Sequence, residues 1–188
     1  MTTASTDRAA AVRTALRSLV AKNGFHGTPM SAIAREAGVA TGTAYTHYAS
    51  KDELVLAAYC ETKAALGLAA TADLGAELSA EERFHALWQA CYRYLKANPN
   101  HARFLLQVEH SPYRGIAHES ALANESDPLL AEVARPDVAA RLQPLPVDVL
   151  YELSLSPAVR LAAGGIELTE AQLDEIARAC WRAISRPG

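Results

Sequence analysis

The fold of this chain is decided by the stretch Thr28-Pro-Met-Ser-Ala-Ile-Ala-Arg-Glu-Ala-Gly-Val-Ala-Thr-Gly-Thr-Ala-Tyr-Thr-His-Tyr-Ala-Ser-Lys51. It predicts two short helices, over residues 29–37 and 41–47, joined by a tight turn. Thr28 is the expected N-cap of the first helix, with a proline at the first helical position, where its missing N–H is harmless. Gly38 is expected to end that helix, because glycine adopts the positive φ that a sharp turn needs. This pattern indicates a helix-turn-helix.

The second of these helices is too short and too polar at its start to be a core helix, and it suits a DNA groove. The major groove of B-DNA admits one α-helix and exposes base edges and phosphates to its side chains. The start of a helix also offers free N–H groups to a phosphate. The residues able to make such contacts are Gly42, whose backbone can approach closely, Thr43, Tyr45 and His47, and Lys51 at the start of the next helix.

The other periodic segments are also helical, and no strand-like alternation is present. An apolar stripe starting at Val12 predicts a first helix that ends at Asn23-Gly24. Capping boxes, which satisfy the first backbone N–H groups of a helix, are expected at Ser50–Glu53 and Ser79–Glu82. The first box begins a long helix that runs into the low seventies, and the second begins a helix that Asn98-Pro99 stops.

The remaining helices are expected over residues 101–109, 129–142 with a kink or break at Pro136, 147–163, and 169–185. Pro157 lies inside the third of these and either bends that helix or restarts one there. Residues 113–126 are less regular and are expected to form a loop.

The composition is that of a globular protein with a mildly basic N-terminal part. The 188 residues are 50% apolar and carry a net charge of −3, which does not suggest a protein that coats nucleic acid. Residues 1–60 hold six Lys and Arg against four Asp and Glu, whereas the rest of the chain holds twelve against seventeen. A basic module on an acidic body fits a local contact with a polyanion.

The cysteines and the N-terminus favour a cytoplasmic protein. Cys60, Cys91 and Cys180 lie far apart and form no Cys-x-x-Cys motif. An odd number of cysteines, without a signal-peptide pattern, argues for reduced thiols. No apolar run approaches the roughly 18 residues that cross a membrane, so no membrane partner is expected.

Residues 8–60 carry a set of residues at fixed spacing, namely Asn23-Gly-Phe, Thr28, Ile33-Ala-Arg-Glu-Ala-Gly-Val39, Gly42-Thr43, Tyr45, His47-Tyr48 and Ser50-Lys51. In these residues the chain resembles the TetR/AcrR family of transcriptional regulators. The resemblance implies an all-α fold with an N-terminal three-helix helix-turn-helix DNA-binding domain over residues 1–50. It also implies a C-terminal helical ligand-binding and dimerisation domain over residues 51–188, with a helix of about 51–72 as the connector.

The same resemblance implies DNA contacts from Thr28, Arg35, Thr41, Gly42, Thr43, Tyr45, Thr46, His47 and Lys51. Two of these residues have an alternative role that leaves DNA out: Thr28 as a helix cap alone, and Arg35 as the partner of a nearby acid. Tyr48 occupies a place where the family commonly has an aromatic core residue, so it is expected in the core.

Two residues depart from the family's usual pattern. Ala40 stands where a serine cap is common, which costs the following helix about 1 kcal/mol. Thr41 stands where lysine is common, which removes one phosphate contact and softens the salt dependence of DNA binding by about one ion. These changes put the affinity for an operator in doubt, not the fold.

Family members usually bind a small ligand in the core of the C-terminal domain and then release DNA. Candidate pocket residues here are His85, Trp88, Tyr92, Phe104, Val108, His110, Tyr113 and Tyr151, although each can also be ordinary core. The last two helices are the expected dimer interface, forming a four-helix bundle with their symmetry mates. Its candidate residues are Val159, Leu173, Ile176, Cys180, Trp181 and Ile184, which could instead cover the core of their own domain.

The sequence predicts a regulator and not an enzyme. It carries no catalytic or nucleotide-binding motif, and its histidines lack the spacing of metal ligands, so neither a cofactor nor a metal is expected. The expected partners are a double-stranded DNA operator, a second copy of the chain in a homodimer, and an unknown small-molecule effector. The alternative is a helical protein-interaction module without DNA binding.

Overall fold

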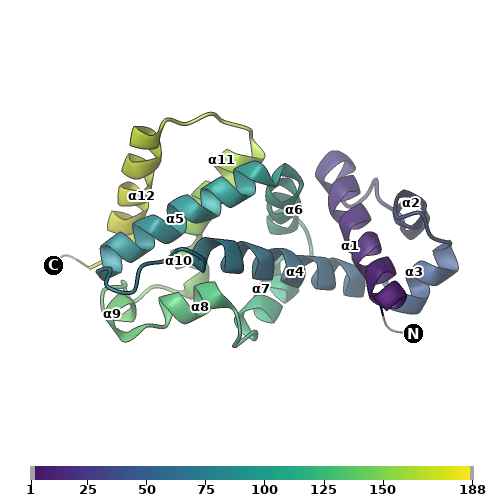
Figure 1. Cartoon of the computed structure of the whole chain (residues 1–188), viewed down its shortest axis with the longest axis horizontal. Helices are drawn as coiled ribbons and strands as arrows, with labels where there is room; N and C mark the ends of the chain where they lie inside the picture. Colours follow the sequence, from purple (N-terminus) through teal and green to yellow (C-terminus); the bar gives the residue numbers. More distant parts are fainter. Residues whose placement is uncertain (1–2, 187–188) are drawn as a thin grey trace. The chain divides into compact units, whose positions relative to one another are not determined.

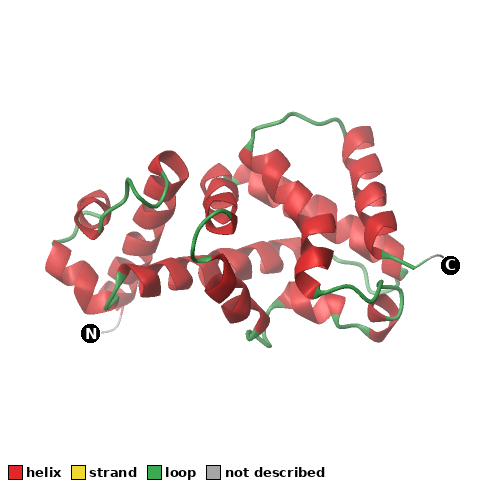
Figure 2. Cartoon of the chain, turned by 180° about the vertical axis from the view of Figure 1, so that it is seen from behind, coloured by secondary structure: helices red, strands yellow, loops and turns green. Residues whose placement is uncertain are grey.

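The computed structural model describes residues 3–186, and all regular elements in that range are helices (Figure 1; Figure 2). They are α1 (Thr3–Asn23), α2 (Met30–Glu36), α3 (Thr41–His47), α4 (Lys51–Thr71), α5 (Ala80–Ala97), α6 (Pro99–Glu109), α7 (Arg114–Leu122), α8 (Pro128–Val133), α9 (Pro136–Ala139), α10 (Val147–Leu153), α11 (Leu155–Ala163) and α12 (Glu170–Ile184). The predicted all-α fold is confirmed.

The chain divides into two compact units, each built from two separate stretches of sequence. Unit 1 contains Met1–Thr62 and Arg103–Ala123, and unit 2 contains Lys63–Ala102 and Asn124–Gly188. Helix α4 therefore begins in unit 1 and ends in unit 2, and α6 leads the chain back to unit 1. The predicted division at residue 50 concerns function and stays a prediction.

In unit 1, helices α1, α2 and α3 pack against one another. Val12, Leu16 and Val20 of α1 and Ile33 of α2 are fully buried, as the apolar stripe of α1 predicts. Between α2 and α3 the chain turns at Gly38, whose φ is +67°. The predicted glycine turn is therefore confirmed.

The start of α2 differs from the prediction. Pro29 occupies the N-cap and no side chain caps the helix. The hydroxyl of Thr28 instead donates to the carbonyl oxygen of Gly24, 2.8 Å away. Gly24 turns the chain with a φ of +68° at the end of α1, and Thr28 satisfies the carbonyl left there. The expected cap at Thr28 is therefore wrong.

Helix α4 starts with a variant of the expected capping box. Ser50 Oγ accepts a hydrogen bond from the Glu53 N–H over 3.1 Å, as predicted. The carboxylate of Glu53 accepts from the N–H of Ala49, 2.7 Å away, and not from that of Ser50. Both bonds satisfy backbone donors that the helix leaves unpaired.

By length and composition alone, α4 could cross a membrane, contrary to the expectation from the sequence. Several of its apolar residues are fully buried within the fold, namely Leu54, Val55, Ala58 and Leu66. Because a core helix of a globular protein passes the same test, the apolar character of α4 is explained by packing.

In unit 2, helices α11 and α12 both pack on α5. The α5–α12 contact includes Phe84 and Trp181, whose ring centroids lie 5.4 Å apart. The predicted capping box at Ser79 is present at the start of α5, and a second box, formed by Thr169 and Gln172, begins α12. These caps fix where the helices start.

Two segments of the C-terminal part differ from the prediction. Residues 113–126 contain helix α7, of which Ala117 is the only buried residue, so its apolar periodicity is too weak to reveal it. The expected helix 147–163 is two helices that break at Ser154. Pro157 lies in the first turn of α11, where its missing N–H breaks no hydrogen bond. The expected break at Pro136 is confirmed, since α9 begins there.

Candidate DNA-binding interface

Helix α3 presents a polar face to solvent. Its only buried residue is Ala44, and the side chain of Tyr45 is 50% exposed. The other predicted contact residues of this helix are Thr41, Gly42 and Thr46, which are exposed, and Thr43 and His47, which are half-buried. The structure therefore brings six of the predicted contact residues together on one seven-residue helix.

Two details of α3 define what this face can offer. Its N-cap is Ala40, and no side chain caps the helix, as expected. The hydroxyl of Thr46 donates to the carbonyl of Gly42 over 3.0 Å, so its hydrogen is used inside the helix. Phosphate oxygens are acceptors, so Thr46 offers its methyl group to DNA more readily than its hydroxyl.

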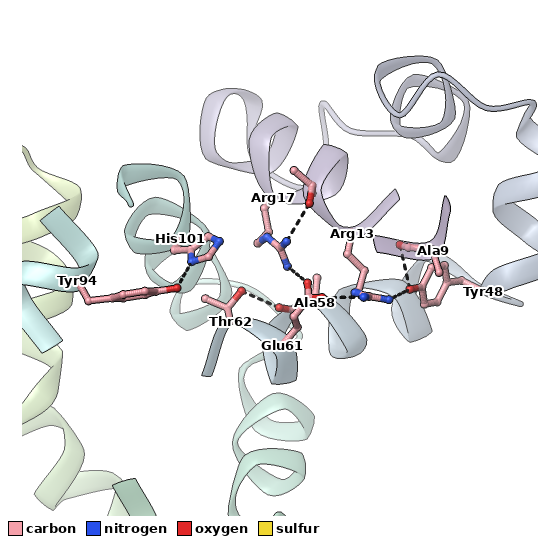
Figure 3. Close-up of polar contacts among 10 residues, drawn as sticks. Ala9, Arg13, Arg17, Tyr48, Ala58, Glu61, Thr62, Tyr94 and His101 are labelled. Carbon is pink, nitrogen blue, oxygen red and sulfur yellow. Dashed lines mark hydrogen bonds and ion pairs between the residues drawn. The ribbon is translucent and has the colours of Figure 1, made fainter. Parts of the chain in front are cut away.

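Tyr48 fixes the C-terminal end of α3 in the core of unit 1 (Figure 3). Its side chain is 6% exposed, and its hydroxyl accepts a hydrogen bond from Arg13 and lies 3.3 Å from the carbonyl oxygen of Ala9. The expectation of a core role for Tyr48 is confirmed. A tyrosine anchored to α1 in this way holds α3 in a fixed orientation.

A three-residue ion cluster, shown in Figure 3, joins α1 to α4. Glu61 of α4 pairs with Arg13, 2.7 Å away, and with Arg17 of the same face of α1. Burial raises the pKa of Glu61, but the hydrogen bonds from the two arginines outweigh it and hold that pKa below its usual value. The hydrogen bond to Glu61 is also the main reason why the pKa of Arg13 is raised.

This cluster was not predicted from the sequence. The spacing of Arg13 and Arg17 places both on one helix face, which is a signal for a shared partner. The sequence cannot identify Glu61 as that partner, because the two helices meet only in the folded chain.

Lys51 has a structural contact as well as a predicted DNA contact. Its Nζ donates to the carbonyl oxygen of Phe25 over 2.6 Å and lies 5.9 Å from the centroid of that ring. Burial lowers the pKa of Lys51, and the charge of Asp52 partly offsets this. An ammonium group carries three N–H donors, so two remain for a phosphate.

The two remaining residues predicted to contact DNA, Thr28 and Arg35, differ in exposure. The side chain of Thr28 is fully buried, with its hydroxyl bonded to Gly24, so a contact between this side chain and DNA is not compatible with the structure. Arg35 is exposed, and no ion pair joins it to another described residue. The alternative that Arg35 pairs with a nearby acid is therefore not seen in residues 3–186.

The predicted pocket residues are divided between the two units. Phe104, Val108, His110 and Tyr113 belong to unit 1, whereas His85, Trp88, Tyr92 and Tyr151 belong to unit 2. Phe104 and Val108 are fully buried, and His110 is exposed. The Nε2 atom of His85 is buried and lies 3.8 Å from Oε1 of Glu81. The ring centroid of Tyr151 lies 5.9 Å from Nζ of Lys63. Their role in effector binding stays a prediction.

Trp88 and Tyr92 use their polar atoms for structural hydrogen bonds. The indole Nε1 of Trp88 donates to the carbonyl of Ser154, and the hydroxyl of Tyr92 donates to that of Ile166, each over 2.9 Å. Both side chains are less than 5% exposed. These contacts agree with the alternative that the two residues are ordinary core.

Most residues predicted for the dimer interface are buried in the single chain. Val159, Leu173, Cys180, Trp181 and Ile184 are each at most 6% exposed, and Ile176 is half-buried. The buried five cannot offer free surface to a partner, because α11 and α12 already pack on α5. They agree with the alternative of a core within their own domain.

Comparison with known proteins accounts for both parts of the chain. The family model described as bacterial regulatory proteins of the tetR family matches residues 12–58. The family model described as a tetracyclin repressor-like C-terminal domain matches residues 80–185. These matches cover the helix-turn-helix with most of its apolar core, and helices α5 to α12.

Several known regulators match this chain along nearly its whole length. An uncharacterised HTH-type transcriptional regulator of Haemophilus influenzae is 29% identical over 192 residues, which span 99% of this chain and 100% of the relative. The crystal structure of a TetR-family transcriptional regulator from the same species matches with a TM-score of 0.77 at 26% identity, covering 98% of this chain and 100% of the other. A TetR-family regulator from Marinobacter aquaeolei has the same fold, with a TM-score of 0.78 at 21% identity over all of both chains. With both of its parts matched, this protein belongs to the TetR family of DNA-binding transcriptional regulators.

Proposed function

We propose that the protein is a cytoplasmic, ligand-responsive repressor that binds a near-palindromic operator as a homodimer and leaves it when a small-molecule effector binds. Members of the TetR family act by binding DNA and not by catalysis. The observation that supports the DNA-binding surface is the arrangement of α3, which buries Ala44 and exposes Tyr45. In this proposal residues 1–50 form the DNA-binding domain and α4 connects it to the regulatory residues 51–188.

Sequence discrimination is assigned to the side chains of α3. Thr43, Tyr45 and His47 are half-buried or exposed, and residues of these types can contact base edges or phosphates in the major groove. Thr41 offers no positive charge where the family commonly has one. The proposal therefore leaves more of the sequence discrimination to Thr43, Tyr45 and His47.

A homodimer explains how a single short helix can select a long site. One α3 covers one half-site, and two-fold symmetry places two such helices about 34–36 Å apart, which is one turn of DNA. The exposed faces of α11 and α12 are proposed as the interface, in a four-helix bundle with their symmetry mates. The buried residues of both helices would then support this surface from beneath.

Release from DNA is proposed to follow a shift between two spacings of the DNA-binding domains. An effector that binds one spacing more tightly moves the population toward that spacing and weakens operator binding. The operator in turn weakens effector binding by the same factor. The connector α4 carries the change, because it is continuous from Lys51 to Thr71. Effector binding is proposed for the regulatory residues 51–188, as predicted from the sequence.

The experiment is a selection of DNA by the purified protein from a random duplex library, with the mass of the complex measured by light scattering. The proposal expects an enriched motif with two inverted half-sites and two chains for each duplex. Enrichment of no sequence would reject DNA recognition. A single half-site bound by one chain would reject the homodimer while leaving DNA binding intact.

A further inference from the structure

An aromatic contact links the turn after α1 to the start of α7 within unit 1. The ring of Phe25 lies 4.9 Å from that of Tyr113 and 6.3 Å from that of Phe104, measured between centroids. Phe25 is 9% exposed, so these rings form a packed cluster. The DNA-binding domain predicted from the sequence therefore contacts a segment that follows it by tens of residues.

The hydroxyl of Tyr113 reaches the first turn of α4. It donates to Oδ1 of Asp52 over 2.8 Å. Burial, together with the hydrogen bond to Asp52 and the charge of that residue, raises the pKa of Tyr113 to about 12. The phenol is therefore protonated at neutral pH and remains a donor to the carboxylate.

Lys51 contacts the same group of residues. Its ammonium donates to the carbonyl of Phe25 over 2.6 Å, and it precedes Asp52 in the chain. Tyr113 thus contacts two residues beside Lys51: Phe25, whose carbonyl accepts the hydrogen bond from Lys51, and Asp52, which follows Lys51 in the chain. Through these contacts Tyr113 can set the position of a charge that DNA would meet.

We propose that Tyr113 is a positioning residue for DNA binding, which holds Phe25 and Asp52 so that Lys51 presents its two remaining N–H donors to a backbone phosphate. This inference rests on the proposed function. Tyr113 was expected to line an effector pocket, and here its hydroxyl instead occupies an oxygen of Asp52. The negative charge of Asp52 acts on the adjacent ammonium even with this bond in place. The bond holds the carboxylate at Tyr113, and without it the carboxylate is free to turn toward Lys51 and compete with phosphate for the ammonium.

The position of Lys51 has a measurable consequence. Each phosphate neutralised by a lysine releases a condensed counterion. When such a contact is lost, the slope of log affinity against log salt concentration becomes less negative by about one. A role of Tyr113 in stability alone changes how much protein is folded, but it leaves this slope unchanged. The slope therefore separates a positioning role from a structural one.

The test uses Tyr113→Phe, which keeps the ring against Phe25 and removes only the hydroxyl. The probe is the duplex that the full-length wild-type protein enriches from a random library, and its affinity is measured by fluorescence anisotropy across a range of salt concentrations. We expect Tyr113→Phe to weaken binding about three- to tenfold, the range of one ordinary hydrogen bond, and to lower the magnitude of the salt slope by about one.

Two further variants complete the design. Lys51→Met is expected to lower the salt slope by the same amount, and the double variant is expected to match Lys51→Met alone. Tyr94→Phe is the matched control, because it also removes a half-buried hydroxyl, bonded over 2.8 Å to His101 in unit 2 (Figure 3). Its slope should equal that of the wild type.

The inference is overturned if Tyr113→Phe binds with the wild-type slope, whatever its affinity, or if its effect on the slope adds to that of Lys51→Met. Both results leave DNA recognition by the wild type intact. If the wild type enriches no sequence at all, the proposed function fails and the inference falls with it. Thermal unfolding of each variant confirms that folded proteins are compared.

Discussion

The indole N–H of Trp88 donates a 2.9 Å hydrogen bond to the carbonyl oxygen of Ser154, at the residue where α10 ends and α11 begins. One turn along α5, Tyr92 donates to the carbonyl of Ile166, just beyond the end of α11. Helix α5 therefore binds the backbone at both ends of α11. The contact from Trp88 holds the backbone at Ser154, where α10 and α11 separate although their sequence predicts one helix.

Replacing Trp88 with Phe tests this contact. The substitution keeps an aromatic ring and removes the donor, leaving the carbonyl of the half-buried Ser154 without this partner. Such a loss costs about 1–3 kcal/mol, and urea unfolding should show a lower midpoint of that size. Equal stability of the variant and the wild type would show that the bond does not hold the α10–α11 break.

The ion cluster at Glu61 predicts a second change in stability. Glu61→Gln removes the negative charge between Arg13 and Arg17, and the Arg17 side chain is only 8% exposed. We expect a loss of about 1–3 kcal/mol in urea unfolding, since a nearly buried charge is left unpaired. The matched control is Glu170→Gln, whose carboxylate pairs with Arg93 at 77% exposure, and which should cost less than about 1 kcal/mol. Equal effects of the two variants would contradict the account.

Acid should destabilise the protein through Glu109. Its carboxylate is 5% exposed and pairs with His118 at 2.8 Å and Arg114 at 3.3 Å. Burial raises the pKa of Glu109, but these two partners outweigh it and keep the pKa below its ordinary value of 4.5. Because the folded pKa lies below the unfolded one, the stabilisation is present above about pH 4.5 and is lost as the pH falls through the folded pKa.

The measurement is urea unfolding of Glu109→Gln and the wild type between pH 7 and pH 3. The variant should be less stable at pH 7, and the difference should shrink as the pH falls below 4.5. Glu119→Gln, at an exposed position of α7, serves as the control and should follow the wild type. A difference between Glu109→Gln and the wild type that stays constant down to pH 3 would contradict the assignment.

Tyr45 carries the prediction for DNA recognition. Since its side chain is 50% exposed, Tyr45→Ala should leave the unfolding midpoint unchanged. It should weaken binding to the selected duplex by about 1–3 kcal/mol, the size of one good base contact. Leu68→Ala, which truncates a 64% exposed side chain of α4, should bind like the wild type. Unchanged affinity of Tyr45→Ala would remove Tyr45 from the interface.

The sequence is sufficient where the signal is local. Gly38 and Ala44 establish the turn and the buried side of α3 within a few residues, and Ser79 with Glu82 marks the start of α5. These features follow from backbone conformation and helix periodicity, which neighbouring residues determine. The helix-turn-helix and the six predicted contact residues on α3 can therefore be placed from the amino-acid sequence alone.

The sequence does not reveal a residue's partner where that partner depends on the path of the folded chain. Thr28 is predicted to be a helix cap, but its hydroxyl donates to the carbonyl of Gly24. Tyr113 is predicted to line a pocket, and the sequence does not show that Asp52, 61 positions earlier, accepts its hydrogen bond. The sequence of α7 predicts a loop, because ion pairs to Glu109 secure this helix in place of an apolar stripe. Only the fold brings these partners together.

The selection of DNA from a random library tests the central claim most directly. The account predicts enrichment of a near-palindrome whose half-sites lie about 34–36 Å apart, bound by two chains, and weaker enrichment of the same sequence by Tyr45→Ala. A purified, folded protein that enriches no sequence would contradict it.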